Sequence, residues 1–201
     1  MNARLLAAIL ALVIVPAARS APGPKSSGED ETPYKSAKVG DYATYKMTTK
    51  VGGISIDGVM TQTVSAKSDK EMTIKSAAKL ATGGVDVPTP EQESTIDLTK
   101  PFDPIKAGFL GQGGAGGAVP TVEKLKEGKE KLKVAGKEYE ATWTTYSLNM
   151  NAGGQQIEAE MKVWSSPKFS FYMLKTEVSA TIAGMKMEMM MELTEVGAKG
   201  K

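Results

Sequence analysis

Methionine is the residue type in this 201-residue chain whose number and spacing indicate a possible binding site. Near the C-terminus, methionines occupy every second position at Met185, Met187, Met189 and Met191. Residues two apart in a strand lie on the same face, so this spacing predicts a strand face lined with thioethers. Methionines in other predicted strands, together with one tryptophan, complete the candidate site residues, which are Met47, Met60, Met72, Met187, Met189 and Trp164.

Three roles fit this set of side chains. Flexible thioethers fill irregular gaps in a closed core. They also line adaptable grooves for apolar ligands, because methionine repacks around different shapes. As soft ligands they suit Cu(I), which gives a third alternative. Trp164 precedes the aromatic residues Phe169 and Phe171, and the pattern there predicts a sheet corner where the indole is a packing anchor or a ligand contact.

Histidine and cysteine are both absent from the chain. Their absence excludes Ser-His-Asp and Cys-His nucleophiles, zinc sites built on these ligands, and disulfides. Two carboxylate pairs remain, Glu158 with Glu160 and Glu188 with Glu192. Hydrolysis by paired carboxylates needs environments that separate their pKa values, and a water-exposed strand face does not supply them. We therefore predict no enzymatic activity, no cofactor and, apart from the Cu(I) alternative, no metal.

A glycine pattern and a lysine pattern are similar to nucleotide-binding and nucleic-acid-binding motifs, but we expect neither to bind such a ligand. Gly111, Gly113 and Gly116 match the dinucleotide-binding spacing, but prolines flank them where a strand and a helix are required. We predict a glycine-rich loop at 108–117. The lysines between residues 124 and 133 alternate with glutamates and lack aromatic residues that would stack on bases, so a solvated strand face is expected rather than a nucleic-acid site.

The N-terminus has the layout of an export signal. Arg4 precedes an uncharged apolar run at 5–15, which is followed by Pro16 and small residues. The run is shorter than the roughly 20 residues of a membrane span, so we expect cleavage, no integral span afterwards, and a soluble periplasmic or secreted protein. Removal of the signal peptide would also remove Arg4 and Arg19, after which the basic and acidic residues are equal in number. The remaining chain would then have no net positive charge to attract nucleic acid. The predicted divisions are a signal peptide at 1–21, a flexible tether at 22–38, a single β domain at 39–197 and a tail at 198–201.

Alternation of apolar and polar residues dominates the chain after Val39 and predicts nine or ten strands. The turn signals between runs include Gly52-Gly53, Ser68-Asp69-Lys70, Ala135-Gly136 and Ala183-Gly184. A short strand is expected at 94–98, and two runs, 125–127 and 131–134, flank Gly128. The fold class is therefore all-β, with one curved antiparallel sheet or open half-barrel, and a β-sandwich is the alternative.

Three stretches resemble a known class of exported β-proteins. They are Val39-Gly40-Asp41-Tyr42 with Tyr45, Gly136-Lys137-Glu138-Tyr139 leading to Trp143, and Lys162-Val163-Trp164-Ser165. Their order and spacing are similar to those of the lipoprotein-carrier half-barrels, the LolA/LolB-like class. The resemblance implies a curved antiparallel sheet over an apolar cavity that binds acyl chains or a lipidated partner. Residues 167–169 depart from the class pattern after the tryptophan, and the covering helices of the carriers are not evident.

We therefore expect an exported binding protein for an apolar ligand, such as an acyl chain, or for a lipidated or envelope partner. One alternative is a structural envelope-associated module with a closed methionine-rich core and no small ligand. The other alternative is binding of Cu(I) by the methionines. The ligand and the oligomeric state are left open by the sequence.

Overall fold

The computed structural model describes residues 33–82, 85–100, 121–152, 155–182 and 184–198. Within these ranges the chain is nearly all β, with one short 3-10 helix, η1 (Pro33–Ser36), and no α-helix. The strands are β1 (Asp41–Val51), β2 (Ile54–Lys67), β3 (Glu71–Thr82), β4 (Val85–Pro88), β5 (Gln92–Asp97), β6 (Thr121–Val134), β7 (Lys137–Ala152), β8 (Gln155–Ser165), β9 (Met173–Ile182) and β10 (Met185–Ala198).

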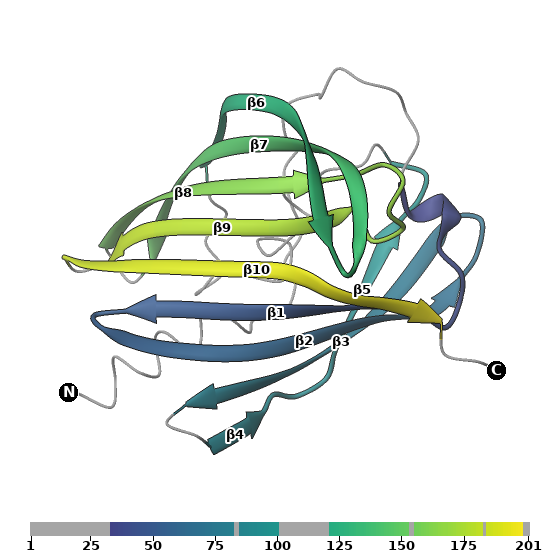
Figure 1. Cartoon of the computed structure of the whole chain (residues 1–201), viewed down its shortest axis with the longest axis horizontal. Coiled ribbons are helices and arrows are strands. Elements are labelled where there is room, and N and C mark those ends of the chain that lie inside the picture. Colours follow the sequence, from purple (N-terminus) through teal and green to yellow (C-terminus); the bar gives the residue numbers. More distant parts are fainter. Residues whose placement is uncertain (1–32, 83–84, 101–120, 153–154, 183, 199–201) are drawn as a thin grey trace.

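All the described strands belong to one open antiparallel sheet, in the order β4-β3-β2-β1-β10-β9-β8-β7-β6. Strand β5 pairs with β3 beside β4, so two short strands share that edge. The first and last strands of the domain, β1 and β10, meet in the middle of the sheet. Figure 1 shows the sheet curving strongly through β6 and β7. The predicted curved sheet is confirmed, and the alternative β-sandwich is wrong because the strands form a single sheet.

Tight turns join most neighbouring strands where the sequence predicted them. Gly52 and Gly53 connect β1 to β2 with φ angles of 54° and 85°, and Ala135 and Gly136 connect β6 to β7 with 49° and 72°. Two consecutive positive φ angles match the twist of an antiparallel hairpin. Glycine adopts them freely because it lacks a Cβ.

The two faces of the sheet differ in burial, as alternation predicts. In β10, Met187, Met189 and Met191 are buried, whereas Lys186 and Glu188 are exposed. We call the face that carries these methionines the inner face and the opposite one the outer face. The orientation predicted for this strand is confirmed. Other strands contribute buried residues to the inner face, among them Tyr45, Met47, Met60, Val64, Met72, Ile74 and Leu193.

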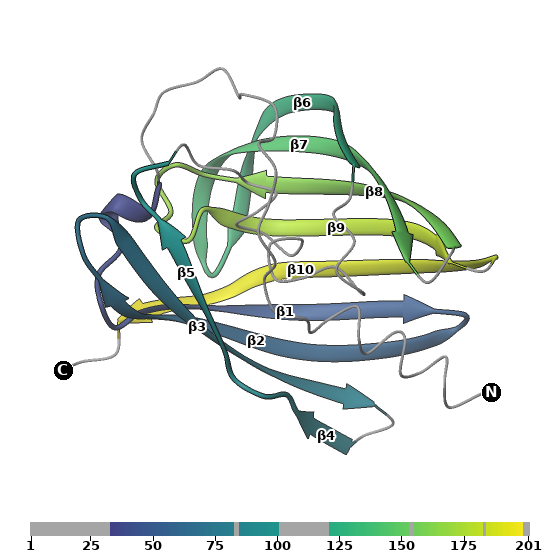
Figure 2. The ribbon, with the colours of Figure 1, turned by 180° about the vertical axis from the view of Figure 1, so that it is seen from behind.

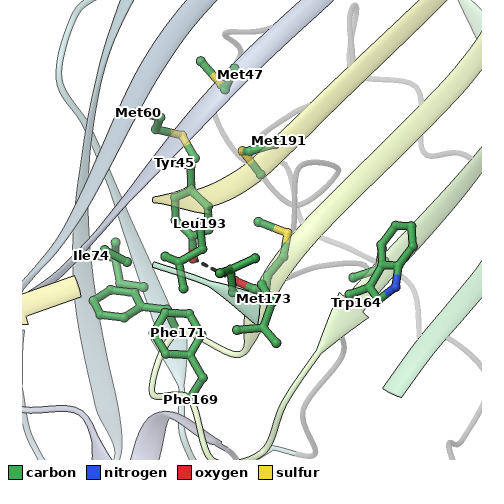
Figure 3. Packing of buried hydrophobic residues seen from close by; sticks show 14 of the residues in the cluster. Tyr45, Met47, Met60, Ile74, Trp164, Phe169, Phe171, Met173, Met191 and Leu193 are labelled. Atoms are coloured by element: carbon green, nitrogen blue, oxygen red, sulfur yellow. Dashed lines mark hydrogen bonds between the residues drawn. The ribbon is translucent and has the colours of Figure 1, made fainter. Parts of the chain in front are cut away.

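The main core lies on the inner face, toward the turn that connects β8 to β9. The hydroxyl of the fully buried Tyr45 donates a hydrogen bond to the carbonyl of Met173, with an O···O distance of 3.1 Å, which ties β1 to β9 across β10. Phe169 and Phe171 lie in the turn with ring centroids 5.9 Å apart. Figure 3 shows Phe171 among the other buried side chains of this cluster. The two phenylalanines that follow Trp164 thus pack into the core.

The folded domain begins earlier than the sequence predicted. Tyr34 and Ala37 lie in the range 22–38 assigned to a tether, yet both are buried. The ammonium of Lys67 donates hydrogen bonds to three backbone carbonyls of residues 34, 35 and 37, at 3.1, 2.7 and 2.6 Å. Residues 33–38 are therefore held against β2 and belong to the domain.

Several predictions concern residues outside the described ranges. These are the signal peptide at 1–21, the first part of the tether, the glycine-rich loop at 108–117 and the end of the tail. Within the part of the chain that the structure describes, no helix has the length and apolar character needed to cross a membrane.

Two strand assignments differ from the sequence prediction. Strand β4 was not predicted, and it pairs with the end of β3 despite ending at Pro88. Strand β6 runs continuously through Gly128, where the alternation predicted an interruption. Figure 2 shows β6 and β7 as two long neighbouring strands from the reverse side. Their pairing explains why one glycine does not end the strand.

Candidate functional site

The methionines of the inner face gather where the first and last strands of the domain pair. Met47 of β1 lies directly opposite Met191 of β10. Met189 follows on the same face of β10, opposite Thr49. Met60 of β2 lies opposite Tyr45, the next inward-facing residue of β1. Directly opposite side chains in an antiparallel pair are close enough to touch, as Met47 and Met191 are. Met60 and Met189 lie on the same face at neighbouring positions and belong to the same buried cluster, and we call these four residues the thioether surface.

Met161 and Met173 extend this surface toward β8 and β9. Met161 lies opposite Val178, which in turn lies opposite Met189. The sulfur of Met173 accepts a hydrogen bond from the hydroxyl of Thr176 at 2.9 Å. Neither residue is among the candidate site residues predicted from the sequence. Alternation predicts that Met161 faces inward, but it would place Met173 with Lys175 and Glu177 on the outer face. Met173 is nevertheless buried, next to a register shift between β8 and β9 that alternation does not predict.

Two of the candidate methionines lie away from this surface. Met72 is fully buried near the start of β3, opposite Ile96 of β5. Met187 belongs to a separate small cluster with Ile157 and Ala180. The candidate methionines therefore face one side of the sheet but do not converge on one point.

Trp164 does not join the methionines. It follows the inward-facing Val163, so alternation places it on the outer face, and Figure 3 shows it apart from the methionine side chains. Its indole N–H donates a hydrogen bond to the Glu130 carboxylate. The ammonium groups of Lys162 and Lys175 lie 4.3 and 5.0 Å from its ring centroid. Trp164 is thus buried in the same core cluster as most of the methionines but is not part of the thioether surface, and its contact with a ligand stays a prediction.

Gly58 is an inner-face residue that the site prediction missed. It lies between Met47 and Leu80 in the paired strands. A Cβ at this position would stand 2.8 Å from a Leu80 methyl carbon and 3.2 Å from the Met47 methyl carbon. The signal was a glycine within an alternating strand, which often marks a close approach by neighbouring groups.

The electrostatic properties of the inner face are those of an apolar interior. Burial raises the pKa of Tyr45 well above its ordinary value, with smaller contributions from Tyr34 and Tyr139. Desolvation disfavours the charged form of any group placed here. The inner face is therefore suited to contact with apolar groups and unsuited to holding an anion.

Of the four carboxylates considered for catalysis, three are exposed and Glu192 is half-buried. Glu158 and Glu160 are exposed on β8, and a hydrogen bond from Lys186 lowers the pKa of the exposed Glu188. Among the described residues, no group of three or more acidic, histidine or cysteine side chains is placed to hold a metal ion. The chemistry available at the site is therefore that of thioethers and hydrocarbon.

The comparisons with known proteins bear on the fold. No protein-family model matches this chain, and no curated protein matches it. A crystal structure described as a "putative exported protein with YmcC-like fold" from Bacteroides fragilis is 8% identical, with a TM-score of 0.46, and the match covers 80% of this chain and 96% of that one. A "putative lipoprotein" from Parabacteroides distasonis is 10% identical, with a TM-score of 0.54 and coverage of 84% and 100%. Neither description names the lipoprotein-carrier class, and at 10% identity the second match shows a shared fold alone.

Proposed function

We propose that this protein is an exported, envelope-associated binding protein whose methionine-rich inner face takes an apolar chain, such as the acyl chain of a lipid or of a lipidated partner. The observation that carries the proposal is the pairing of β1 with β10, which brings Met47, Met189 and Met191 together on one face. An unbranched thioether can change rotamer at low energetic cost, so such a surface adapts to a flexible chain.

The location follows from the sequence and is supported by one comparison. The apolar run at 5–15 has the length of a signal-peptide core. The Parabacteroides distasonis protein, which has a similar fold, is described as a "putative lipoprotein". This chain has no cysteine to carry a lipid anchor, so it would reach lipid by binding it rather than by modification.

We further propose a binding role rather than a catalytic one. The described carboxylates of the two considered pairs lie toward the outer face, away from the thioether surface. A ligand on the inner face would therefore contact apolar side chains and no acid–base pair.

A second candidate function is a structural envelope module with a closed core. It is favoured by the burial of Met47, Met60 and Met189, of which only 7%, 9% and 7% is exposed. With so little exposed surface, an acyl chain could enter only if these side chains repacked. The two candidates thus differ in whether the interior opens for a ligand.

Native mass spectrometry of protein purified from its own envelope, followed by lipid extraction, separates the candidates. Binding predicts an adduct with the mass of an acyl lipid, released by organic solvent. A single ligand-free mass, together with no uptake of a fluorescent fatty acid, would refute the binding role and leave the closed core. Titration with Cu(I) under the same conditions tests the third alternative, which predicts a bound metal mass instead.

A further inference from the structure

The two edges of the sheet are built differently. The edge at β3 is covered by two short strands, β4 and β5, and β4 ends at Pro88. The other edge is β6, which runs unbroken from Thr121 to Val134 and, within the described residues, pairs with β7 alone. Short strands and proline are ways in which proteins prevent an edge from pairing with another chain. The β6 edge lacks both.

The charges along β6 are complementary to themselves. When a second β6 runs antiparallel with Gly128 opposite Gly128, Lys126 lies opposite Glu130 and Glu127 lies opposite Lys129. All four charged side chains are exposed, and within the chain Glu127 pairs with Lys124 while Glu130 accepts the hydrogen bond from Trp164. Lysine on an edge usually repels a neighbouring strand, but in this register each lysine meets a glutamate. The two-fold symmetry of the pair repeats both contacts.

An aromatic side chain lies over the centre of this register. Trp143 of β7 is opposite Gly128, and a Cβ on Gly128 would stand 2.6 Å from the indole Cζ2. The indole therefore covers the glycine and extends toward the free edge. Residues opposite each other in antiparallel strands have Cα atoms about 5 Å apart, so a second copy would bring the two Trp143 rings together above the paired glycines.

We propose that β6 is a dimerisation edge, at which two copies of this chain pair their β6 strands antiparallel about Gly128. The paired segment is Lys126 to Glu130, because the register of β6 against β7 shifts between Lys124 and Lys126. Such a shift bends the strand, so residues before Lys126 would not continue the regular pairing with a second β6. Five paired residues, charged contacts and one indole on each side make a weak dimer that high salt dissociates. The proposal is independent of ligand binding on the inner face.

A charge exchange at one contact tests the register. Glu127→Lys places two lysines opposite each other in both halves of the dimer, and Lys129→Glu places two glutamates opposite each other. Each variant should weaken self-association by roughly tenfold or more, since two attractive contacts become repulsive. An equimolar mixture of the two variants should restore the dimer, because every contact between unlike chains is again between opposite charges. Matched controls are Glu158→Lys and Lys186→Glu, which make the same charge changes at exposed positions elsewhere.

Sedimentation velocity of the mature protein over a concentration series at low salt gives the association of each form. The proposal predicts a wild-type dimer, weakened in both β6 variants, unchanged in both controls and restored in the mixture. A wild type that stays monomeric throughout would overturn it. So would a dimer that persists unchanged in the two β6 variants, or a mixture that associates no better than either variant alone.

Discussion

Replacing one methionine of β10 tests the facing of the strand and the packing behind it. Met189 and Met190 are neighbours in sequence, but 7% of Met189 and 36% of Met190 is exposed. Met189→Ala removes three side-chain groups at about 0.8 kcal/mol each and leaves a cavity, so the free energy of unfolding should fall by about 2–5 kcal/mol. For a chain of this size, a loss of about 3 kcal/mol lowers the melting temperature by roughly 6–12 °C.

Met190→Ala is the matched control for this change. The side chain lies on the outer face, so its removal should alter the free energy of unfolding by less than about 1 kcal/mol. Urea unfolding followed by circular dichroism measures both variants. If Met190→Ala were the more destabilising of the two, the assignment of inner and outer faces would be refuted. A loss near zero for Met189→Ala would instead show that the inner face is not packed around this side chain.

Three further predictions follow from single groups. Burial raises the pKa of Tyr45, so its phenol should resist ionisation until the protein unfolds, and stability should fall as pH rises above about 10. Alkaline titration followed by tyrosinate absorbance measures the ionisation. Hydrogen bonds from Thr99, aided by Lys100, lower the pKa of Asp97 to about 2. The stability that the charged carboxylate contributes is therefore lost as pH falls through that value. NMR titration of Thr99→Ala should show the pKa of Asp97 moving back toward 3.8. Gly128→Ala should lower the melting temperature, because its Cβ would overlap the ring of Trp143; unchanged melting would show that the indole moves aside freely.

Local pattern was enough to predict most of the strands and the faces they present. Alternation placed Met187 and Met189 inward, because a strand with one wet face exposes every second residue. Paired glycines such as Gly52 and Gly53 marked a hairpin, because only a few residues adopt positive φ without strain. These features depend on neighbours within a few residues, so the sequence contains the information directly.

Features that depend on distant residues were not predictable in this way. Tyr34 stands in a stretch rich in proline, serine and charge, and only its contact with the region of Lys67 makes it part of the fold. Trp164 is held by Glu130, two strands away in the sheet. The thioether surface itself depends on the pairing of β1 with β10, which lie at opposite ends of the domain sequence. No local periodicity specifies which strands become neighbours.

Titration of the protein with a fluorescent fatty acid tests the proposed binding role most directly. Binding on the inner face predicts a saturable signal that Met191→Asp abolishes, because a carboxylate beside Met47 would face an apolar chain. Glu188→Gln, on the outer face of the same strand, should leave the signal unchanged, and circular dichroism should confirm that each variant is folded. No saturable signal in the wild type, or equal binding by folded Met191→Asp, would contradict an acyl-binding inner face.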